Sequence, residues 1–294
     1  MPNLILVDKP ASMTSFKVVS AIKRLTGIKR VGHTGTLDPM ATGVLPIFTG
    51  RASRLSRFML EENKRYEATV RLGTATDTGD ITGETISTRD VNIDDVQLKD
   101  ALFHFVGDIE QIPPMYSALK KDGVRLYELA RKGIEVDRAP RNVTVFSIDL
   151  VKRLDNTDFI MDVSCSKGTY IRTLAEDIGE YLGTGATLTA LRRTEVSGFT
   201  VSDCVPLEEI EKNGAETYLL DPQLAVIHLR ECNVSKKQAA RFLCGGQLDI
   251  ARIPDGDTFF DGEFLRVRSD AEFLGIGEAD LKNNRINISC IIKE

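Results

Sequence analysis

The sequence predicts a mixed α+β protein with a largely antiparallel sheet and flanking helices, followed by a small C-terminal β module. Two observations support this fold class. Strand and helix patterns follow one another without the regular alternation of a parallel βαβ protein. After about residue 226 the pattern changes to short apolar runs separated by Gly, Asp and Asn, which is typical of a small β domain. We therefore expect a large domain over residues 1–225 and a small one over residues 226–294.

The N-terminal part of the chain carries clear local signals. Residues 66–72 alternate strictly between apolar and polar types, which predicts a half-buried strand. Thr14 is a candidate N-cap and Gly27 lies just past the expected helix end. In chain order we expect a buried strand at 3–7, a helix between Thr14 and Gly27, a Gly-, Thr- and Pro-rich loop at 31–50, a strand at 66–72, a polar turn region at 74–83 and a helix at 94–105 that begins with a capping box of Asp94 and Gln97.

A long excursion, Pro113–Arg141, begins the second half of the large domain. It carries seven lysines and arginines and four acids, and we expect a helix around residues 124–132 that is ended by Gly133. After it, the expected elements are an antiparallel strand pair at 143–151 and 158–165, a helix at 169–182 and a strand at 188–199.

Composition limits the class of protein. The chain has 294 residues and 42% apolar residues, enough for one large domain and a small one. No apolar stretch approaches the roughly 20 residues that span a bilayer, so we expect a soluble protein without a membrane segment. The five cysteines form no C-x-x-C pair and no His cluster accompanies them, which favours reduced thiols in a cytoplasm over disulfides or a zinc site.

The net charge of −5 hides an uneven distribution. Residues 1–60 hold nine lysines and arginines and only two acids. A polyanion would respond to this basic stretch rather than to the mean charge. Many basic stretches are only solvated faces, so the pattern alone does not identify a nucleic-acid-binding protein.

Asp38 is the only carboxylate in the densest segment of the chain, Gly32–Pro46. Three Gly and two Pro within these 15 residues predict a loop of defined shape. Asp38 is therefore either a working group or an ion-pair partner. The segment lacks the phosphate-loop pattern and the ligand spacing of a metal site. His33 is either a base or, more commonly for a lone histidine, a structural residue.

Four further residues are candidates with two interpretations each. Arg172 lies near an expected strand–helix junction, where it either neutralises a carboxylate or is an ordinary surface arginine. Tyr170 lies two residues before it. Tyr66 is either a core residue or an aromatic ring that stacks on a splayed base. Leu191 by itself indicates only core.

The segment Gly32–Gly43, with the sequence GHTGTLDPMATG, resembles the active-site loop of the TruB family of bacterial tRNA pseudouridine synthases, which modify uridine 55 of the T-loop. The resemblance extends from residue 4 to about residue 200, and the last ~65 residues are similar to the family's PUA module. The other matching segments are Lys64–Glu67, Leu72–Gly73, Thr76–Asp80, Pro114–Lys120, Tyr127–Glu128, Cys165–Thr173 and Leu191–Arg193.

The resemblance implies roles for six residues. Asp38 would be the catalytic aspartate, and Arg172 would pair with it. Tyr66 would stack on the flipped uracil. The base pocket would be lined by Tyr170 and Leu191. His33 would occupy the space that the flipped base leaves in the RNA, and the excursion at 113–141 would close on the RNA.

The implied function is isomerisation of uridine 55 in tRNA on the pseudouridine synthase fold, without a cofactor or metal. The implied partner is tRNA, bound at its T-loop and acceptor end by a cytoplasmic monomer with no obligate protein partner. A non-catalytic tRNA-binding or tRNA-folding factor would share the basic patch and the tail, but only the enzyme needs a carboxylate at Asp38. A glycosidase would need a second acid beside Asp38, for which Asp77 and Asp80 are candidates.

Overall fold

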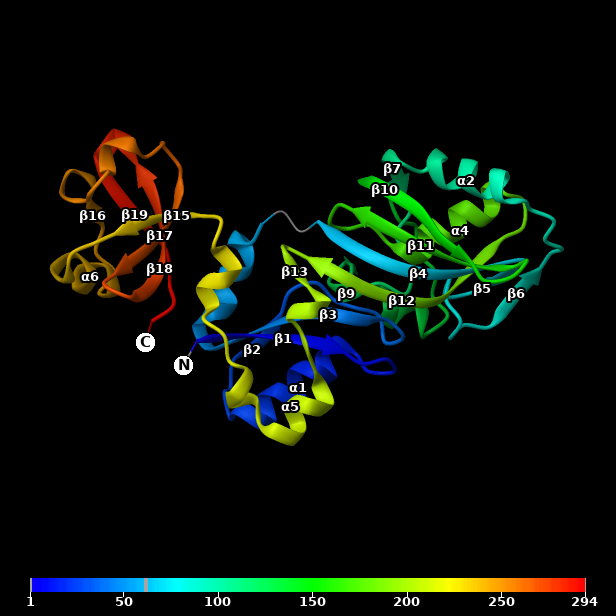
Figure 1. Ribbon diagram of the computed structural model, residues 1–294, viewed down its shortest axis with the longest axis horizontal. Helices are drawn as coiled ribbons and strands as arrows, with labels where there is room; N and C mark the ends of the chain where they lie inside the picture. Colours follow the sequence, from blue (N-terminus) through cyan, green and yellow to red (C-terminus); the bar gives the residue numbers. More distant parts are fainter. Residues whose placement is uncertain (1, 61–62, 294) are drawn as a thin grey trace.

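The computed structural model describes residues 2–60 and 63–293, which form one large and one smaller sheet (Figure 1). The large sheet has ten strands in the order β14-β1-β3-β12-β4-β11-β10-β7, with β2 beside β3 and β13 beside β12. Its strands are β1 (Asn3–Lys9), β2 (Val31–His33), β3 (Thr42–Thr49), β4 (Lys64–Leu72), β7 (Gly107–Gln111), β10 (Arg141–Arg153), β11 (Asp158–Cys165), β12 (Ala186–Val196), β13 (Phe199–Thr200) and β14 (Val205–Pro206). Within it, β1/β14 and β3/β12 pair in parallel and the other described pairs are antiparallel, which confirms the predicted fold class.

Helices cover the two ends of this sheet in separate layers. The helices are α1 (Ser15–Thr26), α2 (Asp95–His104), α4 (Ile171–Tyr181) and α5 (Leu207–Asn213). Helices α2 and α4 pack on β4, β10 and β11 around one apolar cluster, while α1 and α5 pack on β1 and β3 around another (Figure 1). The loop that carries Asp38, the candidate catalytic residue, lies between β2 and β3, next to both helical layers.

Local sequence signals explain most of the expected elements, but the loop expected at 31–50 contains two strands of the large sheet, β2 and β3. The Thr14 side chain accepts a hydrogen bond from the Lys17 amide at 3.2 Å, and Gly27 ends α1 in the left-handed region at φ +67°. The capping box of Asp94 and Gln97 begins α2. Strand β4 buries alternate side chains from Tyr66 onward because both of its neighbours, β11 and β12, face the same helical layer.

The excursion at 113–141 differs from its prediction. In place of a helix at 124–132, it contains a short hairpin of β8 (Lys120–Lys121) and β9 (Val124–Arg125), followed by the five-residue helix α3 (Leu126–Ala130). Asp122 and Gly123 both have positive φ, at 51° and 84°. A two-residue Asp-Gly turn of this kind favours a hairpin, and it overrides the helical pattern that follows. The polar region after β4 likewise forms a small hairpin, β5 (Thr74–Thr76) with β6 (Thr85–Thr88).

The C-terminal module is a five-stranded sheet in the order β15-β17-β18-β19-β16. Its strands are β15 (Arg230–Asn233), β16 (Leu248–Asp249), β17 (Phe264–Ser269), β18 (Glu272–Asp280) and β19 (Arg285–Ile291). The expected β module is confirmed, and it includes one helix that the sequence expectation lacked, α6 (Lys236–Leu243), begun by a capping box of Ser235 and Gln238.

The two sheets meet at a 3-10 helix, η1 (Gly50–Phe58). Leu55 and Phe58 of η1 share an apolar cluster with Phe273 and Ile276 of β18. Three arginines of η1 also donate hydrogen bonds to backbone carbonyls at the end of the chain. These pairs are Arg51 with Lys293 at 2.9 Å, Arg54 with Ile291 at 3.4 Å and Arg57 with Ser289 at 2.6 Å. The N-terminal basic stretch therefore contributes to structure as well as to surface charge. No helix in the described ranges is long and apolar enough to cross a membrane.

Candidate active site

The loop between β2 and β3 is fixed by backbone and hydroxyl contacts. The Ser15 hydroxyl, at the start of α1, accepts from the Leu37 amide at 2.9 Å and donates to the Leu37 carbonyl at 3.2 Å. The Ala41 amide donates to the Asp38 carbonyl at 3.1 Å, which closes a turn around Asp38. Gly43, at φ +102°, is required because a Cβ there would lie 2.1 Å from the Arg193 carbonyl oxygen.

Asp38 forms a bidentate ion pair with Arg172. Arg172 Nε lies 2.9 Å from Asp38 Oδ2, and Nη2 lies 3.2 Å from Oδ1. The same guanidinium donates to the Thr78 carbonyl at 2.8 Å and the Tyr116 carbonyl at 2.7 Å. The Arg172 side chain is 3% exposed and that of Asp38 32% exposed, so the carboxylate is the accessible member of the pair. Because Tyr116 belongs to the excursion at 113–141, Arg172 also ties that excursion to the loop.

The charge of Asp38 is set by opposing influences. Burial raises the pKa of its carboxyl above the usual aspartate range, while the Arg172 guanidinium opposes the increase. An arginine stays protonated in proteins, so protonation of Asp38 would leave a buried cation without its nearest counter-charge. The pair therefore favours the carboxylate form of Asp38 at neutral pH.

Asp80 and Asp77 do not supply a second working acid. Asp80 is 5% exposed, and its Oδ1 accepts from the Thr82 amide at 2.9 Å and from the hydroxyls of Thr78 and Thr82. Its Oδ2 lies 3.9 Å from Arg172 Nε. Asp77 accepts from the Glu84 amide at 2.8 Å within a turn. Asp80 thus helps to hold Arg172, and its buried, hydrogen-bonded carboxylate is not available as the second acid of a glycosidase.

Tyr66 and Leu191 lie on neighbouring strands and form one side of the same apolar cluster. Each is 7% exposed, and the cluster also contains Leu37 and Ala41 from the two sides of Asp38 in the loop. Burial raises the pKa of the Tyr66 phenol to about 12, although the Arg193 guanidinium opposes the increase. The phenol is therefore neutral at physiological pH and presents an apolar ring with a polar tip.

Tyr170 is positioned through its backbone. It is the N-cap of α4, and the buried Gln111 side chain contacts both of its peptide groups. Gln111 Oε1 accepts from the Tyr170 amide at 3.0 Å, and Nε2 donates to the Tyr170 carbonyl at 3.3 Å. Burial raises the pKa of the Tyr170 phenol. Because Arg172 follows two residues later, the same contact fixes the first turn of α4, which carries the partner of Asp38.

His33 lies at the end of β2, opposite Ile47 of β3. Burial lowers its pKa, and the charge of Arg193 lowers it further, so the ring is neutral at physiological pH. Among the described residues, no hydrogen bond or ion pair joins His33 to Asp38, and its Nδ1 is buried without a partner. The structure thus brings Asp38 and Arg172 into contact, with Tyr66 and Leu191 in the adjoining cluster, and shows no hydrogen bond or ion pair from His33 to either of them among the described residues.

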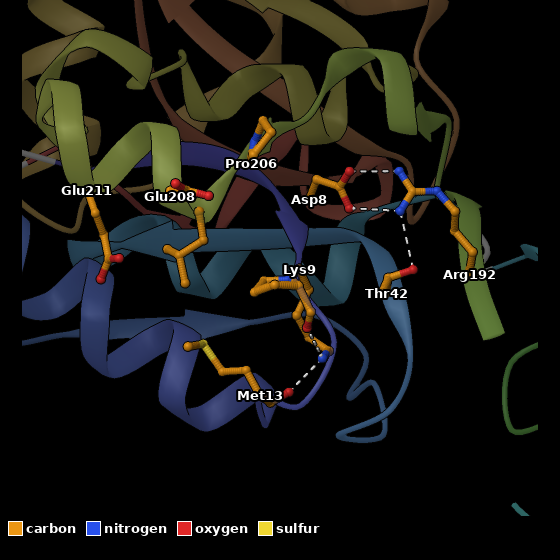
Figure 2. A pocket seen from close by; sticks show the side chains of 10 residues that line it. Asp8, Lys9, Met13, Thr42, Arg192, Pro206, Glu208 and Glu211 are labelled. Atoms are coloured by element: carbon orange, nitrogen blue, oxygen red, sulfur yellow. Dashed lines mark hydrogen bonds and ion pairs between the residues drawn. The ribbon is translucent and has the colours of Figure 1, made fainter. Parts of the chain in front are cut away.

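Two buried cationic residues near the loop, Lys9 and Arg193, were not among the candidates from the sequence. Lys9, at the end of β1, is fully buried and donates to the carbonyls of Pro10 and Met13 at 2.7 and 2.5 Å (Figure 2). It also donates to the Pro39 carbonyl at 3.3 Å. Burial lowers the pKa of Lys9 to about 8, although Asp38 opposes the decrease. Arg193, in β12, is also fully buried. A charged residue that ends an apolar strand was the only sequence signal for Lys9.

Figure 2 shows a cavity of about 290 Å³ that is lined by residues of β1, β12 and α5, Lys9 among them. It is bordered by an ion pair between Arg192 and Asp8, with atoms 2.7 Å apart, and Arg192 also donates to the Thr42 hydroxyl at 3.2 Å. None of the six predicted site residues lines it. The described residues contain no group of three His, Cys, Asp or Glu side chains that could hold a metal.

Comparison with known proteins identifies the family. Residues 23–171 match the model of the TruB family pseudouridylate synthase N-terminal domain, and residues 172–230 match that of the tRNA pseudouridylate synthase B C-terminal domain. The chain belongs to the TruB family. A protein of Aromatoleum aromaticum named tRNA pseudouridine synthase B is 45% identical over 281 residues, which cover 95% of this chain and 89% of that protein. A Clostridium perfringens protein of the same name is 39% identical, covering 97% and 98%.

Solved structures agree on the fold of this TruB family member. A chain from a Cbf5-Nop10-Gar1 complex superposes with a TM-score of 0.74 at 24% identity, covering 99% of this chain and 85% of the other. A chain from an H/ACA RNP bound to a substrate RNA gives a TM-score of 0.73 at 21% identity, with the same coverage. At these identities the likeness shows the fold alone. The predicted family and the predicted enzyme class, a pseudouridine synthase, are confirmed by the family models and the named relatives.

Proposed function

We propose that the protein isomerises uridine 55 in the T-loop of tRNA to pseudouridine, with Asp38 as the catalytic residue. The observation that carries the proposal is the bidentate pair of Asp38 and Arg172, in which a buried cation holds a partly exposed carboxylate at the tip of a fixed loop. Family membership and the names of the relatives support the reaction and the substrate.

The reaction needs one reactive carboxylate and protection from water. It breaks the bond between N1 of uracil and C1′ of ribose, turns the base, and joins C5 to C1′. The proton on C5 is then lost to solvent and N1 gains a proton, so the step balances with no redox or phosphoryl chemistry. Asp38 supplies the carboxylate as a nucleophile or a base, and Arg172 keeps it ionised and oriented. Leu37 and Leu191 provide apolar surface that keeps water from hydrolysing the intermediate.

The substrate base must leave its stack to reach Asp38, at a cost of a few kcal/mol. In the proposal Tyr66 stacks on the flipped uracil, Tyr170 and Leu191 line its pocket, and His33 fills the space that it leaves in the RNA. The contact between Tyr116 and Arg172 supports a role for the excursion at 113–141 in closing over the RNA.

The proposal assigns residues 1–225 to catalysis and residues 226–294 to a PUA-like RNA-binding domain that contacts the acceptor end of the tRNA. Five exposed basic residues between Lys17 and Arg30 supply positive charge for phosphate contacts. We also propose that the protein acts as a monomer in the cytoplasm, where its five free cysteines stay reduced.

Replacement of Asp38 by asparagine tests the proposal. Asp38→Asn keeps the shape of the side chain but removes its charge, so turnover should fall on the order of 10³-fold or more while tRNA binding persists. Tritium release from tRNA labelled at C5 of uridine measures turnover, and sequencing-based mapping locates the product. Asp100→Asn, an exposed change on α2, is the control. Wild-type protein that leaves uridine 55 unmodified, or an Asp38→Asn variant with near-normal turnover, would overturn the proposal.

A further inference from the structure

Arg193 lies at the centre of the large sheet, between the stacking tyrosine and the end of the catalytic loop. In β12 it is opposite Tyr66 of β4 on one side and opposite Gly43 of β3 on the other. It is the largest of the fully buried side chains in the described residues. No substrate atom needs to reach it, so its role must be exerted through its neighbours.

The guanidinium of Arg193 connects the two flanks of the loop that carries Asp38. Nε donates to the Val44 carbonyl at 2.8 Å, and Nη2 donates to the Gly35 carbonyl at 3.0 Å. Gly35 precedes Asp38 and Val44 follows it, so one rigid group fixes the width of the loop at its base. Arginine suits this task because its donors form a planar fork of fixed geometry.

Two glycines of the loop make room for this connection. A Cβ on Gly35 would lie 3.1 Å from Arg193 Nη1, and a Cβ on Gly43 would lie 2.1 Å from the Arg193 carbonyl oxygen. Both glycines also have positive φ, at 70° and 102°. The loop thus approaches Arg193 as closely as its backbone permits, and its shape depends on the arginine being present.

The charge of Arg193 is not neutralised by an adjacent acid. Among the described residues it forms no ion pair, and its Nη1 has no partner at hydrogen-bond geometry, although the guanidinium lies near enough to the Tyr66 hydroxyl to lower the pKa of that phenol. Its charge lowers the pKa of both His33 and Lys9. Burial of an unpaired cation opposes folding, and an apolar residue of similar volume would avoid that cost. Because the buried Arg193 guanidinium lowers the stability of the fold, its presence at this position indicates a role in the function of the site.

We propose that Arg193 is a positioning residue for the isomerisation: it sets the width of the loop and thereby holds Asp38 at a fixed distance from the Tyr66 ring. The inference rests on the proposed function, because it assumes that Asp38 and Tyr66 act on one base. Since Arg193 is buried, its loss affects the rate of the reaction at saturating tRNA and leaves the RNA-contacting surface in place.

The test compares Arg193→Met, Arg193→Lys and a control, Arg71→Lys. Arg71 lies on the same strand as Tyr66 and forms a bidentate pair with Asp158, but it is distant from the loop in the sheet register. A misplacement of about 1 Å can cost a reaction about 10²-fold, so Arg193→Met should lower the single-turnover rate by that order. The dissociation constant for tRNA should change less than about threefold, and amide exchange should increase in residues 35–44.

Arg193→Lys keeps the charge but reaches only one of the two carbonyls, so its rate should fall between the wild type and Arg193→Met. An unchanged rate in Arg193→Met, a loss confined to tRNA affinity, or an equal loss in Arg71→Lys would overturn the inference. If Arg193→Met does not fold, the lysine variant decides by its rate at an unchanged melting temperature. Inactive wild-type protein would instead contradict the proposed function itself.

Discussion

At the scale of single residues, Arg172 holds the candidate site together through four hydrogen bonds. It holds both oxygens of Asp38 and two backbone carbonyls from different segments, Thr78 and Tyr116. Asp38 could be proposed from the sequence because it is the only acid in a loop shaped by Gly and Pro. Its partner came from the family resemblance, since 134 residues separate the two and no local pattern joins them.

Arg172→Met should destabilise the fold by about 3–5 kcal/mol, because it leaves the buried Asp80 and the partly exposed Asp38 without their shared counter-charge. Arg24→Met is the matched change at an exposed pair, where the side chains of Arg24 and Glu211 are 71% and 42% exposed, and it should cost less than about 1 kcal/mol. Urea unfolding at neutral pH measures both. Similar losses for the two variants would show that burial adds nothing to the pair of Asp38 and Arg172.

At the scale of elements, local chemistry decided which predictions succeeded. The bounds of helix α1 could be predicted because Thr14 caps its first residue and Gly27 caps its last. The helix expected at 124–132 was wrong over its first residues because the turn at Asp122 and Gly123 prefers a hairpin. Arg193 could not be predicted, because its partners lie on three other segments and its burial depends on the completed sheet.

Glu176 of helix α4 makes the stability of the protein depend on pH. Burial raises the pKa of this carboxyl to about 7, from an ordinary value of 4.5, although Arg172 opposes the increase. The native protein therefore binds a proton that the unfolded chain has already lost between about pH 4.5 and pH 7. Stability from this group is fully present below pH 4.5 and is lost as the pH rises through 7.

Glu176→Gln should therefore become more stable relative to the wild type as the pH rises. The difference should grow by about 2–3 kcal/mol between pH 5 and pH 8 and then level off. Urea unfolding of both proteins at intervals of one pH unit measures it. A difference that stays constant over this range would mean that the Glu176 pKa is not raised in the native state.

At the scale of the whole molecule, the two sheets share contacts through η1. A chain that ends at Val226 would lose Phe273 and Ile276 from the cluster that covers Phe58. All the contacts of the Asp38 and Arg172 pair come from residues before 173, so they do not depend on the second sheet.

The truncated chain should therefore fold with lower stability, retain turnover at raised tRNA concentration, and bind tRNA at least about tenfold more weakly. Phe58→Ser in the same truncated chain is a control for the apolar surface that the truncation exposes. Near-ultraviolet circular dichroism reports the fold and titration reports the affinity. A truncated chain without a cooperative unfolding transition would contradict a separate C-terminal domain.

The three arginines of η1 also explain how the second sheet ends. Strand β16 pairs with β19 only at Arg285 and Ile286, so the carbonyls beyond them would form an open strand edge of the kind that recruits other chains. A 3-10 helix rises about 6 Å per turn, and two residues of a strand span about 6.7 Å. One arginine per turn can therefore meet every second carbonyl, so the spacing of a basic helix covers this edge of the second sheet.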